Sequence, residues 1–238
     1  MRDNEEHLSH RRAFLAGSAL LLGAKVVAAT PILAQPQDEE NEEDVTPAED
    51  LMREHGALNR ILLIYDEAVA RIDAKKEFPP EVLVSAAGIV RRFIEEYHEK
   101  LEEDHLFPRF EKAGKLTDLV SVLRQQHAAG RSLTRLIETN STLPALRNAT
   151  QRAQLRKNLR LFVRMYRPHE AREDTILFPA LHTLIDPNDY EELGDQFESK
   201  EHQLFGQDGF EKVVAEIAGL EKKIGLYELA QFTPAGLA

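Results

Sequence analysis

The 238-residue sequence contains no cysteine and no tryptophan. The absence of cysteine excludes disulfides, thiolate metal sites and cysteine catalysis, and it leaves His, Asp, Glu and Tyr as the strong metal-binding side chains. Basic residues are outnumbered, so the formal net charge is −11, which argues against nucleic acid or an anionic membrane as a partner. A chain of this length can bury one substantial core.

Residues 1–34 are interpreted as an export signal and not as part of the fold. Residues 9–15 read SHRRAFL, and a short apolar run follows over residues 16–29. Paired arginines, then Phe-Leu and a weakly hydrophobic stretch, resemble a twin-arginine signal. Lys25 interrupts the run, so no stable membrane span is expected. We therefore predict export by the twin-arginine machinery, to the periplasm or otherwise out of the cytoplasm. A cytoplasmic protein with an irregular N-terminus is the alternative.

Residues 35–46 are rich in Asp and Glu. This composition is typical of a solvated linker, with a binding tail as the alternative.

Four long amphipathic helices are expected between residues 47 and 185. The first begins at residues 46–49 (TPAE), where Thr caps, Pro suits the first helical position and Glu completes a capping box. The others are expected at about 81–105, 116–138 and 149–184, with Pro108 and Gly114 ending the second. Leu136 is expected to face inward from the third. Long helices joined by short loops predict an all-α, up-down-up-down four-helix bundle.

Residues 186–238 are predicted to form a C-terminal helical extension. Two shorter helices are expected over 188–202 and 208–223, with glycines between them. The tail contains Leu229 and Phe232 and is expected to pack across the bundle.

A pattern of eleven residues occurs twice in the predicted bundle. Residues 98–108 read HEKLEEDHLFP, and residues 169–179 read HEAREDTILFP. Both fit H-E-x-x-E-[ED]-x-x-L-F-P. Each copy also has a lone histidine at a matched distance upstream, His55 for the first and His127 for the second. The bundle is therefore expected to consist of two related halves.

The repeated histidines and glutamates have the spacing of metal ligands. A residue four positions along a helix returns to the same face, about 6 Å away, so His98 and Glu102 can point at one spot, as can His169 and Glu173. With the upstream histidine, each half offers two imidazoles and a carboxylate, which is a ligand set for a first-row metal. The sequence thus predicts a two-metal site. Buried salt bridges to arginine are the competing explanation for the glutamates.

The repeat resembles the hemerythrin-type (HHE) cation-binding domain over about residues 47–185. Ferritin-like di-iron bundles differ, because they use Glu-x-x-His pairs. The resemblance implies a non-haem di-iron centre, with one iron held by His55 and His98, the other by His127 and His169, and Glu102 and Glu173 as bridges. Four imidazoles and two carboxylates suit iron best, and manganese or zinc is the alternative.

The chain departs from the oxygen-carrying members of this family at Arg131. Those members have a further histidine there, and they bridge with an Asp five residues after the histidine that matches His169. Arg131 cannot be a ligand because its guanidinium stays protonated. It is expected to leave a coordination position open or to pair with Glu173 or Asp174. Asp174 competes with Glu173 as the bridge, and the match of Glu102 to Glu173 across the repeat favours Glu173.

Two more residues near the repeat have candidate roles. Tyr166 lies three residues before His169, so its phenol could bind or hydrogen-bond a metal-bound oxygen species, with core packing as the alternative. Glu95 holds the matching place before His98 and could accept a hydrogen bond from a metal ligand. The resulting hypothesis is a protein that binds dioxygen or a related small ligand such as nitric oxide. The alternatives are a di-iron enzyme that acts on peroxide or oxygen, and iron storage.

Overall fold

The computed structural model describes residues 45–236, and within this range the protein is helical without strands. The predicted signal (1–34) and residues 35–44 of the predicted linker lie outside the described residues. From Thr46 onward the chain forms one compact unit. None of the described helices is both long and apolar enough to cross a membrane.

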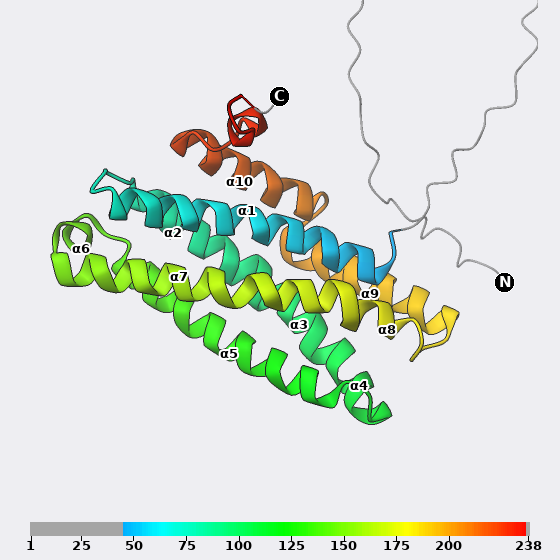
Figure 1. Cartoon of the computed structure of the whole chain (residues 1–238). Helices are drawn as coiled ribbons and strands as arrows, with labels where there is room; N and C mark the ends of the chain where they lie inside the picture. Colours follow the sequence, from blue (N-terminus) through cyan, green and yellow to red (C-terminus); the bar gives the residue numbers. More distant parts are fainter. Residues whose placement is uncertain (1–44, 237–238) are drawn as a thin grey trace, which may run out of the picture. The chain divides into compact units, whose positions relative to one another are not determined.

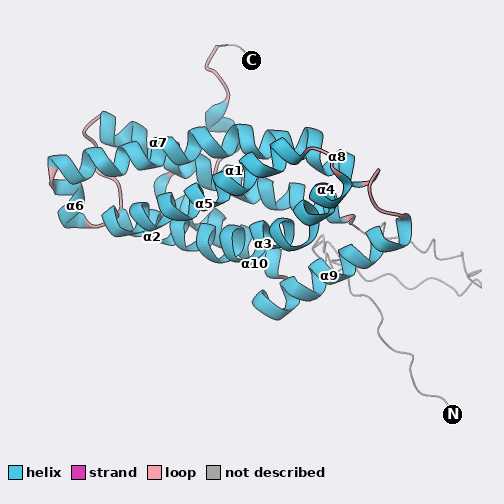
Figure 2. Cartoon of the chain, turned by 90° about the horizontal axis from the view of Figure 1, so that it is seen from below, coloured by secondary structure: helices cyan, strands magenta, loops and turns pink. Residues whose placement is uncertain are grey.

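Figure 2 shows helices over almost the whole described chain. In chain order they are α1 (Pro47–Asp73), α2 (Pro80–Ile89), η1 (Val90–His98), α3 (Glu99–Leu101), η2 (Glu102–Leu106), α4 (Phe107–Ala113), α5 (Thr117–Asn140), α6 (Leu143–Arg147), α7 (Ala149–Arg172), η3 (Glu173–Leu177), α8 (Phe178–Leu181), α9 (Pro187–Phe205), α10 (Gly209–Ile224) and η4 (Leu229–Phe232).

The predicted capping box at the start of α1 is present. The Thr46 hydroxyl accepts a hydrogen bond from the Glu49 backbone, and the Glu49 carboxylate accepts one from the Thr46 backbone. These bonds satisfy amides that have no partner inside the helix. The side chains of Asn148 and Asp186 cap α7 and α9 by accepting hydrogen bonds from backbone amides of the first turn, so local chemistry sets the start of three of the long helices.

The long helices form rods that lie side by side (Figure 1). The helical segments from α2 to α4 follow one another without a break and form one rod, and the segments from α7 to α8 form another. Helix α1 packs against α7, α7 against α5, and α5 against α2 and η1, while η1 also contacts α1. The apolar side chains between these rods form one buried core, which surrounds the predicted ligands.

In both copies of the repeat, the chain becomes π-helical at the glutamate predicted as a ligand. Segment η2 begins at Glu102 and η3 begins at Glu173, while η1 ends at His98. A π-helix closes its turns with i→i+5 hydrogen bonds, so each turn holds an extra residue, and such turns are frequent at functional sites. The spacing argument had indicated ordinary α-helix at these places.

Three expectations about the helices are wrong. The second helical path continues through Pro108, which lies in the first turn of α4, and ends at Ala113. Gly114 is the left-handed C-cap, so of the two residues expected to end this path only Gly114 does. Leu136 is 46% exposed, and its neighbour Ile137 is buried instead. The tail packs on the core through Leu226 but does not extend across the bundle, since Leu229 and Phe232 are 82% and 48% exposed.

The C-terminal helices α9 and α10 pack on α1, and α10 also contacts α2 (Figure 1). Their contact is partly aromatic, because Phe205 and Phe210 lie against Phe93. It is also ionic, because Arg60 of α1 forms a two-pronged pair with Glu221 of α10. The extension therefore belongs to the same compact unit as the rods.

Candidate metal centre

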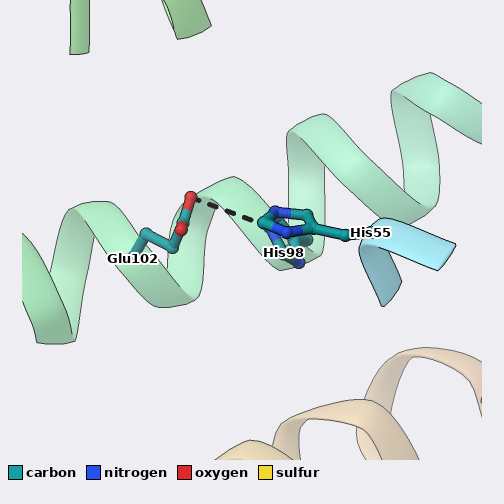
Figure 3. Close-up of side chains that lie close together, drawn as sticks. All are labelled: His55, His98 and Glu102. Carbon is teal, nitrogen blue, oxygen red and sulfur yellow. Dashed lines mark ion pairs between the residues drawn. The ribbon is translucent and has the colours of Figure 1, made fainter. Parts of the chain in front are cut away.

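The six residues predicted as ligands lie together in the interior, although they come from four rods. They are His55 on α1, His98 at the end of η1, Glu102 at the start of η2, His127 on α5, His169 on α7 and Glu173 at the start of η3. Each is at most 3% exposed. Their candidate ligand atoms form two groups of three, each within 4.8 Å. Figure 3 shows the first group, with Glu102 reaching along its helix toward His98 and His55 entering from α1.

Every one of the four histidines turns its Nε2 atom toward a glutamate oxygen. Glu102 Oε2 lies 3.8 Å from Nε2 of His98 and 3.4 Å from Nε2 of His127. Glu173 Oε2 lies 3.0 Å from Nε2 of His169 and 3.4 Å from Nε2 of His55. Each glutamate therefore lies next to one histidine of each half of the repeat.

The opposite ring nitrogen, Nδ1, of each histidine has a polar partner. The pairs are His55 with Asp174 at 2.7 Å, His98 with Glu54 at 2.7 Å, His127 with Glu103 at 3.1 Å, and His169 with Gln126 at 2.9 Å. Because these oxygens accept, Nδ1 carries a proton, and in the neutral ring Nε2 has a lone pair for a metal. Histidines that bind metals in proteins commonly have such partners, which fix the ring and its tautomer.

The two inner glutamates are fully buried, and their nearest partners are the predicted ligand histidines. Neither oxygen of Glu102 or of Glu173 has a hydrogen-bond partner of good geometry. Burial raises the pKa of Glu102 to about 8, and the charge of Glu173 adds to this rise. Burial also acts to raise the pKa of Glu173, but His169 and His55 hold it below its usual range. Metal binding requires neutral imidazoles, and neutral imidazoles give these two carboxylates no positive charge. A metal cation held by the four imidazoles would supply it, so these residues fit a metal site.

The two histidines of the first group differ in basicity. Burial lowers the pKa of His98 well below its usual value, and the neighbouring His55 lowers it further. Burial also acts to lower the pKa of His55, but its contacts with Asp174 and Glu173 raise it well above the usual value. Metal binding requires both rings to be neutral, so protons compete with the metal at His55 more than at His98.

The second residue of each repeat copy is a buried glutamate that meets the other half. Glu99 forms an ion pair with Arg131 at 2.8 Å and accepts a hydrogen bond from the Tyr166 hydroxyl at 2.7 Å. Glu170 accepts one from Asn59. Burial raises the pKa of Glu99 and of Glu170 to about 8. Arg131 and Asn59 occupy matched positions, one helical turn after His127 and His55. Their side chains contact Glu99 and Glu170 and not the Nε2 atoms of the predicted ligands.

The structure corrects two expectations about the surroundings of the site. Arg131 was expected to pair with Glu173 or Asp174, but it pairs with Glu99 and, at 2.7 Å, with Glu103. Glu95 was expected to accept a hydrogen bond from a ligand, but none of the four Nδ1 atoms has it as partner. Asp174 lies on the outer nitrogen of His55 and not among the inner oxygens.

The Tyr166 hydroxyl depends on a glycine in the facing helix. A Cβ atom on Gly130 of α5 would lie 2.0 Å from this hydroxyl. Gly130 therefore leaves room for Tyr166 to reach Glu99. The ring of Tyr166 also meets that of His169 edge-on, with centroids 5.4 Å apart. Of the two roles proposed for Tyr166, the structure shows a buried ring whose hydroxyl already has a partner.

Sequence reasoning missed the partners of the outer nitrogens. Glu54 and Gln126 directly precede the two lone histidines, and Glu103 directly follows a predicted ligand. A signal was available, because Glu103 and Asp174 hold the same place in the two repeat copies, as do Glu54 and Gln126 relative to the lone histidines. Matched polar residues beside matched ligands are the expected pattern for outer partners.

These features define a class: an all-helical protein with a buried, metal-binding set of histidines and glutamates. The family described as Hemerythrin HHE cation binding domain matches residues 46–181, and the chain belongs to this family. The chain is also 47% identical over 196 residues to an uncharacterized protein of Mycobacterium tuberculosis (strain H37Rv), Rv1995, and to one of Mycobacterium bovis, Mb2018. Each match covers 82% of this chain and 77% of the relative. No solved structure matches the chain significantly.

Proposed function

We propose that the rods form an up-down-up-down bundle around a non-haem di-iron centre. His55 and His98 hold one iron, His127 and His169 hold the other, and Glu102 and Glu173 bridge them, as the resemblance to the family implies. The geometry that supports this is the contact of each glutamate with one histidine from each half. Iron fits this mixture of imidazole and carboxylate better than zinc, which prefers four ligands, or manganese, which prefers oxygen.

We propose that the centre binds dioxygen or a related diatomic ligand such as nitric oxide. The observation that carries this proposal is the burial of all six ligands to at most 3% exposure. A small uncharged molecule can enter such an interior, whereas a bulky or charged substrate would have to open the core. Iron supplies the affinity for the small ligand, and the chain's own residues hold the rings and exclude water.

A di-iron enzyme acting on peroxide is the second candidate, and Arg131 favours it. Arg131 occupies the place of a further histidine in oxygen-carrying members, and it is held by Glu99 and Glu103. Each iron then has two imidazoles, which leaves more coordination positions open to a substrate.

The two candidates predict different behaviour of the reduced, iron-loaded protein. Reversible binding predicts an absorption band that forms with oxygen and disappears when oxygen is removed over several cycles. Enzyme function predicts catalytic release of oxygen from added peroxide. Iron analysis that gives fewer than two irons per chain after full loading would contradict the di-iron centre itself.

The bridging role of Glu173 can be separated from the outer role of Asp174. Glu173→Gln should abolish the spectrum of a bridged pair, because the amide is a weak, neutral ligand. Asp174→Asn keeps an acceptor for His55 and should only shift the spectrum. The opposite ranking would mean that Asp174 is the bridge.

We also propose that the protein is exported by the twin-arginine machinery. The support is the sequence of residues 9–29. Replacing Arg11 and Arg12 with lysine should leave the full-length protein in the cytoplasm of the producing cell, while the native sequence is found outside it. Equal distribution of both forms would contradict export by this route.

A further inference from the structure

Helix α7 is strongly basic, although the protein as a whole is acidic. The formal net charge of the chain is −11, yet the one acidic residue of α7, Glu170, is buried. Basic residues recur along this helix, at Arg152, Arg156, Lys157, Arg160, Arg164, Arg167 and Arg172. Positive charge is thus concentrated on a single rod, and this rod also carries the predicted ligand His169.

The exposed basic residues of α7 share one side of the helix. Steps of three or four residues return to the same side. Four exposed basic residues follow one another at such steps and form what we call the basic face: Lys157, Arg160, Arg164 and Arg167. Leu161, which is 44% exposed, lies among them. Protein interfaces commonly combine an apolar centre with a polar rim, so this composition suits contact with another protein.

The described part of the protein leaves the basic face open. Figure 1 shows α7 in front of the other rods, and the C-terminal helices lie elsewhere, α9 on α1 and α10 on α1 and α2. Two carboxylates of α1 meet one edge of the face, where Arg160 pairs with Asp73 at 2.6 Å and Arg167 pairs with Asp66. The other two members of the face have no carboxylate partner among the described residues.

The basic face ends where the buried centre meets the surface. Asp174 lies seven residues after Arg167, about two helical turns further along the same rod, so it continues the edge that faces α1. Its side chain is 34% exposed, and its Oδ1 lies 2.7 Å from Nδ1 of His55. A molecule bound at this end of the face would be separated from the ring of a predicted ligand by one side chain.

We propose that the basic face docks an acidic electron-carrier protein that reduces the iron pair, an inference that rests on the proposed function. Binding of the small ligand starts from reduced iron, and the six ligands are buried, so the donor acts from the surface. For each electron transferred, one carrier is oxidised and one ferric ion is reduced to ferrous. Complementary charge steers such docking. An extended polyanion, such as nucleic acid or an anionic membrane, is repelled by the net charge of −11.

The first test is the rate at which a reduced plant-type two-iron ferredoxin, an acidic one-electron carrier, reduces the oxidised iron-loaded chain. In stopped flow, the rate constant should fall at least about tenfold between about 20 and 200 mM NaCl, because salt screens the attraction. Lys157→Glu combined with Arg164→Glu should slow the reaction at least about tenfold at low salt.

The matched control is Lys200→Glu combined with Lys223→Glu, exposed changes of the same total charge on α9 and α10. Because these positions lie off the basic face, the control should react within about twofold of the native chain. Dithionite is a small reductant that needs no docking surface. It should reduce the iron of the native chain and of both variants equally well.

The second test needs no iron. Calorimetric titration of the iron-free chain with oxidised ferredoxin should show binding at about 20 mM NaCl, which weakens at least about tenfold in the variant of α7 but not in the control. Lys157→Gln combined with Arg164→Gln should lie between the native chain and the glutamate variant, because the change of charge is half as large. Circular dichroism checks that the helices of each variant are retained.

Equal rates and affinities in the variant of α7 and the control would overturn the proposal, as would a ferredoxin that neither binds nor reduces the native chain. Tighter binding of the native chain to duplex DNA or to phosphatidylglycerol vesicles than to ferredoxin would also overturn it, because the face would then serve another class of partner. If ferredoxin binds through the basic face but dithionite leaves the spectrum of the iron-loaded chain unchanged, the docking surface stands and the proposed function is contradicted.

Discussion

The first half of the metal centre, His55 and His98, has carboxylates as the partners of both outer nitrogens. Asp174 accepts from His55, and Glu54 accepts from His98, each at 2.7 Å. A carboxylate that accepts from Nδ1 makes the opposite nitrogen a stronger electron donor to a metal. Both histidines of this half therefore have their donor strength increased.

The second half, His127 and His169, has the same arrangement with weaker partners. Glu103 accepts from His127 at 3.1 Å, but it also pairs with Arg131 at 2.7 Å. Gln126, a neutral amide, accepts from His169 at 2.9 Å. Because the two halves share their ligand types, we infer that any difference in their metal affinity comes from the outer partners and not from the ligands. We expect the first half to hold its metal more tightly.

Removal of one histidine from each half should have the largest effect. His98→Ala and His169→Ala each delete a direct ligand, and we expect each to lose at least one metal per chain. His98→Ala should retain less iron, because only the weaker half remains. The measurement is iron content after loading and desalting, with the exposed His202→Ala as the control. Equal retention in the two variants would contradict the difference between the halves.

The pH dependence of the stability should distinguish Glu102 from Glu173. The pKa of Glu102 is raised to about 8 in the folded protein, from an ordinary value of 4.5. The folded, metal-free chain thus keeps a proton that the unfolded chain releases. Its stability is full below about pH 4.5 and declines by up to about 1.4 kcal/mol per pH unit as pH rises toward 8. Bound metal replaces that proton, so stabilisation by metal should grow over the same range.

The measurement is urea unfolding between pH 5 and 8, with and without metal. Glu102→Gln should reduce the decline of the metal-free chain. Glu173→Gln is the matched control. Because the pKa of Glu173 is lowered, its contribution to the free energy of unfolding is lost only as pH falls through that pKa. His55 and His98 have pKa values shifted in opposite directions, so their effects on how stability changes with pH oppose each other. A metal-free chain that gains stability up to pH 8 would contradict the prediction.

The ligands could be predicted from the sequence because they repeat. His98 and Glu102 stand in one copy, and His169 and Glu173 stand at the same places in the other. A two-fold pattern of this kind distinguishes ligands from single buried histidines. The structure brings all of these predicted residues together, as the periodicity of the helices requires.

The outer partners could not be assigned in the same way, because they cross between the halves. Asp174 belongs to the second repeat copy but contacts His55, and Glu103 belongs to the first copy but contacts His127. Such contacts depend on how the rods pack, which helical spacing does not determine. The π-helical turns at Glu102 and Glu173 were missed for a related reason, since side-chain periodicity does not distinguish a single wider turn.

Exchange of the outer partners should have a smaller effect and tests the comparison directly. Asp174→Asn gives the first half a neutral acceptor, and we expect its metal affinity to fall about tenfold. Gln126→Glu gives the second half a carboxylate, and its affinity should rise. Competition with a chelator measures both. A fall in affinity for Gln126→Glu, in a variant that remains folded, would mean that net charge matters more than the basicity of His169.

The smallest change in metal affinity is expected from Arg131, whose counterpart in the first half is Asn59. Arg131→Gln frees Glu103 from its ion pair, so Glu103 should act more strongly on His127. We expect metal affinity to rise by no more than about threefold, because a partner of the ligand changes and not the ligand itself. Stability should fall by about 1–3 kcal/mol, because buried Glu99 loses its cation.

Arg124→Gln is the matched control for this variant. Arg124 lies on the same helix and pairs with Glu111 at the surface, where loss of an ion pair costs about 1 kcal/mol or less. Urea unfolding and chelator competition separate the two effects of Arg131. If Arg131→Gln weakened metal binding tenfold while its stability matched that of the control, Arg131 would act on the metal centre itself. The weaker outer partners would then not explain the difference between the halves.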